Sequence, residues 1–217
     1  MPPDPSSLAL PLALPLVGPG LTGFATGFSL ILAIGAQNVF VLRQGLARRH
    51  VFWVCLVCAV SDALLISAGV AGFGAVAQRV PWLETAMTWG GAAFLAVYGG
   101  MRLRAAWKGE DGIDAAAGGP DPGLRAALLA CLAFTWLNPH VYLDTLALVG
   151  AVGAGFEGAS RLAYGIGAAT ASFVFFFGLG YGARLLAPLL ARPRAWRVFD
   201  LAVGLLMWAL AAGLVLR

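Results

Sequence analysis

Six long apolar segments constrain this chain more than any other feature of its sequence. Each is long enough for a helix to cross the hydrocarbon core of a bilayer, which takes roughly 20 residues. Only 11% of the residues are charged, whereas a soluble domain has about a quarter, so too few polar residues are available to cover a water-facing surface. We therefore predict an all-α, polytopic membrane protein with six transmembrane helices. The segments cover residues 20–42, 51–77, 82–103, 124–152, 162–186 and 198–216.

The positions of these segments predict the domain organisation. Residues 20–217 are predicted to form a single transmembrane domain, and a Pro- and Leu-rich lead-in, residues 1–19, is expected to be poorly ordered. The lead-in has no Lys or Arg, which a secretory signal would need at its start. A polar linker, residues 105–123, separates the halves 20–104 and 124–217.

The basic residues predict the orientation in the membrane. Eleven of the 14 Lys and Arg residues lie in or beside the linkers that follow the first, third and fifth segments. By the positive-inside rule, these linkers are cytoplasmic and both termini lie outside the cytoplasm. Basic clusters between apolar segments suit a protein surrounded by membrane lipid, and no nucleic-acid partner is expected.

Short polar motifs interrupt the first and the fourth segments, at Gly35-Ala-Gln-Asn38 and Leu137-Asn-Pro-His140. The first segment would enter from outside and the fourth from inside. The two halves would then form an inverted repeat of three plus three helices, with broken first and fourth helices. The alternative is that six helices divide into threes without any internal symmetry.

Asp62 and Asp144 are acidic residues well inside apolar segments. Asp62 is about eleven residues into the second segment, roughly 16 Å along a helix and near the bilayer midplane. An ionised carboxylate costs at least a few kcal/mol there, so Asp62 should face a cavity or a cation. Alternatively, a protonated Asp62 donates a structural hydrogen bond. Asp144 is the second such acid. An acid that alternately binds a cation and a proton can couple export to the proton gradient.

The interruptions could provide hydrogen-bond donors for a carboxylate. Pro139 cannot continue a helix, and Asn138 is a good N-cap, so a half-helix with a positive N-terminus could begin at Pro139. A simple proline kink is the alternative. The amides of Gln37 and Asn38 need partners in hydrocarbon, unless they mark the end of a helix. Together these features suit a zwitterion with a cationic side chain.

Two stretches resemble signatures of the lysine/arginine exporter family: AIGAQNVFVLRQGL at 33–46 and TWLNPHVYLDT at 135–145. The second is most similar to the arginine exporter branch. The resemblance implies export of L-arginine or L-lysine across the bacterial inner membrane, driven by protons, without a cofactor. Ala36 stands where the family often has proline, which implies a softer first break. The residues implied in substrate binding or translocation are Gln37, Asn38, Asp62, Asn138, Pro139 and Asp144, with His140 and Tyr142 as secondary candidates.

Other functions stay open at this stage. A related exporter could move neutral amino acids or divalent metal cations. An enzyme is not expected, although His140 and Asp144 at i and i+4 could share a helix face for acid–base chemistry. Cys55 and Cys58 form a C-x-x-C pattern, but residues of this size also pack between helices, and no metal site is expected. Similar small-residue packing could support a homodimer.

Overall fold

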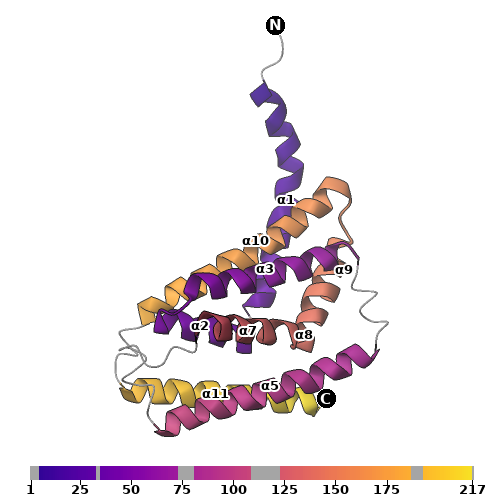
Figure 1. Cartoon of the computed structure of the whole chain (residues 1–217). Coiled ribbons are helices and arrows are strands. Elements are labelled where there is room, and N and C mark those ends of the chain that lie inside the picture. The colour runs from indigo at the N-terminus through magenta and orange to yellow at the C-terminus, as the bar shows by residue number, and fades with distance from the viewer. Residues whose placement is uncertain (1–4, 33–34, 73–80, 109–122, 187–192, 217) are drawn as a thin grey trace. The chain divides into compact units, whose positions relative to one another are not determined.

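Every regular element of the described chain is a helix, which confirms the all-α prediction (Figure 1). The computed structural model describes residues 5–32, 35–72, 81–108, 123–186 and 193–216. The α-helices are α1 (Pro5–Ile31), α2 (Ala36–Ala47), α3 (Val51–Val70), α5 (Pro81–Lys108), α7 (Gly123–Trp136), α8 (Pro139–Val141), α9 (Gly150–Gly153), α10 (Gly158–Gly182) and α11 (Pro193–Val215). Residues Tyr142–Val149 form a π-helix, η1, and Ala183–Leu186 form a 3-10 helix, η2.

Some helix ends differ from the predicted segments. α3 ends at Val70 rather than near residue 77, because Gly72 follows with a positive φ of 97°, a conformation that glycine adopts readily after a helix. α5 continues to Lys108, so the predicted linker 105–123 begins with helical residues, and 109–122 lie outside the described residues. α1 begins at Pro5, within the predicted lead-in 1–19, whose expected disorder stays a prediction.

Three helices of the described chain are long and apolar enough to cross a membrane: Val51–Val70, Gly158–Leu185 and Arg194–Val215. The 20 residues of the first of these extend about 30 Å, the thickness of the hydrocarbon core. Leu16–Ile31 and Ala36–Ala47 would add a fourth span if they are counted as one broken helix. The protein is therefore a multi-pass membrane protein, and the number of six spans stays a prediction.

Both expected helix interruptions are present. α1 ends at Ile31, and α2 begins at Ala36 after Gly35, whose backbone is extended. α7 ends at Trp136, and α8 begins at Pro139. α8 then passes directly into the π-helix η1, which the sequence analysis did not anticipate.

The chain divides into two compact units that alternate along the sequence. The first unit contains Met1–Ala33, Ala59–Arg79 and His140–Phe175, and the second contains Ile34–Cys58, Val80–Pro139 and Phe176–Arg217. Both helix interruptions lie at boundaries between the units. The units therefore do not coincide with the consecutive halves on either side of the linker.

Glycines bring helices of the first unit into backbone contact. Gly23 of α1 lies against the main chain of Tyr164 in α10, and Gly69 of α3 lies against the main chain of Leu146 in η1. A methyl group at either glycine would overlap main-chain atoms. Such close approach is a usual way for membrane helices to associate. The buried core of this unit includes Ile66, Val149, Tyr164 and Ala168.

The second unit is built on the antiparallel pair α5 and α11. The indole Nε1 of Trp208 donates a hydrogen bond to the carbonyl oxygen of Ala96, 3.0 Å away, and Gly204 packs against Leu103. α2 packs against α7, η2 and α11. An aromatic cluster fills the space beside α2, α5 and α7, formed by Phe40, Phe94, Tyr98 and Phe134.

Candidate functional site

Asp62 is a buried acid of the first unit. Asp62 lies on α3 directly after Ser61, and 7% of the surface of Asp62 is exposed. The Ser172 hydroxyl of α10 donates a long hydrogen bond of 3.4 Å to Asp62 Oδ2. Within the described residues, no Lys or Arg forms an ion pair with Asp62. The carboxylate thus has one weak neutral donor from a neighbouring helix, which fits either a cation site or the predicted structural hydrogen bond.

The other first-unit candidates lie on or beside the π-helix. Asp144 and Tyr142 belong to η1, and His140 lies in the preceding α8. Tyr142 is half-buried, whereas the side chains of His140 and Asp144 are outside the described part of the structure. In a π-helix, residue i is hydrogen-bonded to residue i+5 rather than i+4. The expectation that His140 and Asp144 share a helix face at i and i+4 therefore does not apply here.

Gln37 and Asn38 begin a helix rather than end one. They lie in the first turn of α2, after Gly35, which provides no side-chain cap. The first amide N–H groups of this helix have no acceptor in earlier helical turns. Gln37 is 9% exposed, and its buried Nε2 has no hydrogen-bond partner among the described residues. A buried donor without a partner is rare and calls for an explanation. Asn38 is half-buried.

The break at Asn138 is held by a close contact with α5. Pro139 is buried, and Asn138 is half-buried. The backbone N–H of Asn138 donates a long hydrogen bond of 3.4 Å to the Thr135 carbonyl oxygen. Gly91 of α5 lies so close to the Leu137 carbonyl oxygen that a methyl group at Gly91 would overlap it. This contact positions the end of α7 directly before the break.

A buried ion cluster in the second unit was missed by the sequence analysis. Asp200 of α11 is 1% exposed, and its Oδ1 lies 3.4 Å from Arg43 Nε and 3.6 Å from Arg102 Nη1. Arg102 also lies over the ring of Tyr98. The sequence pattern places both arginines among the basic linker residues and indicates no role for Asp200. The sequence contains a sign of this cluster, because Asp200 also lies within a predicted apolar segment.

The cysteines pack as apolar side chains. Cys55 Sγ donates to the Phe176 carbonyl oxygen, 3.1 Å away, whereas Cys58 Sγ lies 3.0 Å from Cys131 Sγ. Cys55 and Cys58 thus contact different partners, and all three cysteines are buried and not joined by a disulfide. In the described ranges, no group of three or more His, Cys, Asp or Glu side chains could hold a metal ion.

Comparisons with known proteins show the family of this chain. Residues 28–217 match the family described as LysE type translocator. The arginine exporter protein ArgO of Yersinia enterocolitica serotype O:8 / biotype 1B is 44% identical over 191 residues, 88% of this chain and 93% of that protein. The arginine exporter protein ArgO of Salmonella paratyphi A is 41% identical over 189 residues, 87% of this chain and 89% of that protein. No solved structure matches this chain. The chain therefore belongs to the LysE type translocator family, as its motifs indicated, and is a multi-pass membrane transporter rather than an enzyme.

Proposed function

We propose that this protein exports L-arginine across the bacterial inner membrane. The observation that carries the proposal is the similarity to two arginine exporters, at 44% and 41% identity over almost nine-tenths of the chain. L-Lysine is the second candidate substrate, because it shares the cationic side chain. Neutral amino acids are less suited to a site with an unpaired acid, and divalent cations are less suited to one without further ligands among the described residues.

In the first unit, Asp62 is the proposed partner of the substrate cation. Its burial, and the lack of an arginine or lysine partner among the residues that the structure describes, support this role. A guanidinium group can form two parallel hydrogen bonds with one carboxylate, which a neutral amino acid cannot reproduce. Asp144 is proposed as a second acid on the same route.

In the second unit, the start of α2 supplies proposed donors for the substrate carboxylate. The unpartnered Nε2 of Gln37 and the backbone N–H groups at the start of α2 are all hydrogen-bond donors. The helix dipole adds partial positive charge at this end. Asn38, Asn138 and Pro139 are proposed to contribute at the two helix interruptions, with His140 and Tyr142 in secondary roles.

Transport is proposed to be coupled to proton entry. Release of the cation leaves Asp62 in a low-dielectric environment, where accepting a proton removes the cost of the bare charge. One carboxylate can thus exchange an outgoing cation for an incoming proton. The proposed topology has six spans in an inverted repeat, with the basic linkers in the cytoplasm and both termini outside.

The test is transport by purified protein reconstituted into liposomes. We expect uptake of labelled arginine under an imposed pH gradient, and Asp62→Asn should reduce it at least tenfold, because a charged hydrogen bond contributes about 1.5–3 kcal/mol. Glu157→Gln is the matched control, since Glu157 is an exposed acid between α9 and α10.

Each part of the proposal has an outcome that would refute it. Folded wild-type protein that moves neither arginine nor lysine would refute the exporter assignment. Arginine transport that is unaffected by Asp62→Asn would make Asp62 structural. Equal transport with and without the pH gradient would remove the proton coupling and leave the substrate assignment intact.

A further inference from the structure

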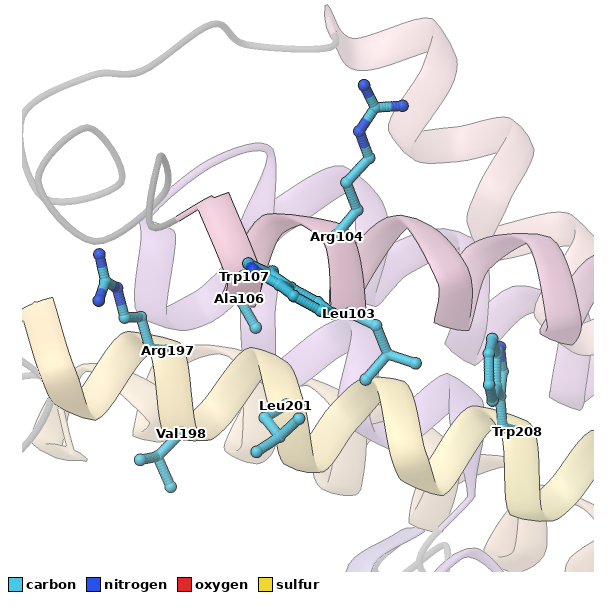
Figure 2. Close-up of a pocket in the computed structure, with 8 residues that line it drawn as sticks. All are labelled: Leu103, Arg104, Ala106, Trp107, Arg197, Val198, Leu201 and Trp208. Atoms are coloured by element: carbon cyan, nitrogen blue, oxygen red, sulfur yellow. The ribbon is translucent and has the colours of Figure 1, made fainter.

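An apolar groove runs along the outer side of the α5–α11 pair in the second unit (Figure 2). It has a volume of about 680 Å³ and is lined by Leu103, Arg104, Ala106, Trp107, Arg197, Val198, Leu201 and Trp208. None of these residues has a role in the proposed transport site. Leu201, Val198 and Trp208 are all exposed, so the groove opens outward.

The two ends of the groove differ in chemistry. Trp208 closes one end, where its ring is held by the hydrogen bond to the Ala96 carbonyl. At the other end, Arg197 extends from α11 beside Trp107, which reaches from α5 and is 92% exposed (Figure 2). Arg104 extends from the neighbouring turn of α5, away from the groove. Tryptophan and arginine together are typical of the membrane–water interface.

The basic end carries charge that the described residues do not neutralise. Arg104 and Arg197 are both exposed, and the residues described as lining the groove include no acid. The nearest acid along α11 is Asp200, which is buried and bound to Arg43 and Arg102. An apolar groove alone would accept any lipid chain, but this end favours an anion.

The length of the groove fits one acyl chain. Arg197 and Trp208 are eleven residues apart on α11, which is about 16 Å along the helix axis. One leaflet of the hydrocarbon core is about 15 Å thick. A headgroup phosphate beside Arg197 would therefore place the end of its acyl chain near Trp208.

We propose that this groove binds an anionic phospholipid of the leaflet that surrounds the basic ends of α5 and α11. Arg197 binds the headgroup phosphate, Arg104 adds electrostatic attraction, and one acyl chain lies over Leu103, Val198 and Leu201. The bound lipid bridges α5 and α11 and so stabilises their pairing.

The test compares lipids that differ only in headgroup charge. Purified protein in a neutral detergent is titrated with phosphatidylglycerol or phosphatidylcholine of identical acyl chains, and binding is followed by native mass spectrometry and by thermal unfolding. We expect phosphatidylglycerol to bind more tightly and to raise the unfolding temperature more. Arg197→Gln should weaken phosphatidylglycerol binding about fivefold, because one basic residue near an anionic surface contributes about that factor.

Two further variants separate the explanations. Arg125→Gln removes an exposed arginine from α7 and should leave the lipid preference unchanged. Leu201→Trp fills the groove and should weaken binding of both lipids. Equal affinity for the two headgroups, or an unchanged preference in Arg197→Gln, would overturn the proposal. Coverage of the groove by a second copy of the chain, seen as cross-linking at position 201 whichever lipid is added, would also overturn it.

Discussion

Asp200→Asn should destabilise the second unit severely. The Oδ1 atom of Asp200 lies 3.4 Å from Arg43 and 3.6 Å from Arg102, so the two guanidinium nitrogens are within about 7 Å of each other. With the carboxylate gone, two positive charges at this distance repel by about 2 kcal/mol at an effective dielectric constant of 20. Removal of one partner from a buried ion pair typically costs about 3–5 kcal/mol, and we expect a loss in that range.

The assay is unfolding of purified protein in mixed micelles, followed by circular dichroism. Arg43→Gln in the Asp200→Asn background should restore about 2 kcal/mol, because it removes the repulsion that the first change exposed. Glu157→Gln, at an exposed acid, should change stability by less than about 0.5 kcal/mol. A stability of Asp200→Asn within about 0.5 kcal/mol of wild type would refute the reasoning. So would an Arg43→Gln change that destabilises both backgrounds equally.

Two adjacent glycines and one buried amide provide further tests. Gly91→Ala should lower the free energy of unfolding by about 1–3 kcal/mol and reduce transport, because the new methyl group overlaps the Leu137 carbonyl oxygen. Gly90→Ala should be tolerated, because its methyl group lies 4.0 Å from the end of the Leu137 side chain. Thermal unfolding and arginine uptake of the two variants check this, and equal effects would contradict it. Gln37→Met should stabilise the protein by about 1 kcal/mol or more, because it removes an unpartnered buried amide, and should lower arginine uptake. Unchanged uptake would exclude Gln37 from the site.

The helix interruptions were predictable because local chemistry decides them. Pro139 lacks an N–H whatever surrounds it, and α8 begins there as expected. The polar pair Gln37 and Asn38 also marked an interruption correctly. Whether Gln37 and Asn38 end one helix or begin the next was not predictable, because amide side chains occur at both kinds of helix end. Only the extended backbone at Gly35 shows that α2 starts after it.

The π-helix and the two alternating units were beyond sequence reasoning. A π-helix gives no distinct apolar period over the eight residues of η1. The units combine segments that are far apart in the chain, and their cores depend on close contacts such as Gly69 with Leu146. Each contact needs a small residue, but a glycine in an apolar segment does not reveal which helix approaches it.

Asp62 and Asp200 show what decides the role of a buried acid. Both are almost completely buried, so burial alone does not distinguish them. Asp200 is neutralised by two arginines that lie 157 and 98 positions away in the sequence, distances at which no local pattern predicts pairing. In the described parts of the chain, the Ser172 hydroxyl is the one hydrogen-bond donor to Asp62. An acid that is already bound to two guanidinium groups is not available to bind a cationic substrate. An acid with one weak donor can still bind a guanidinium group or a proton. The same substitution, aspartate to asparagine, should therefore have different effects at the two positions. Asp62→Asn should retain the fold and lose transport, whereas Asp200→Asn should lose stability.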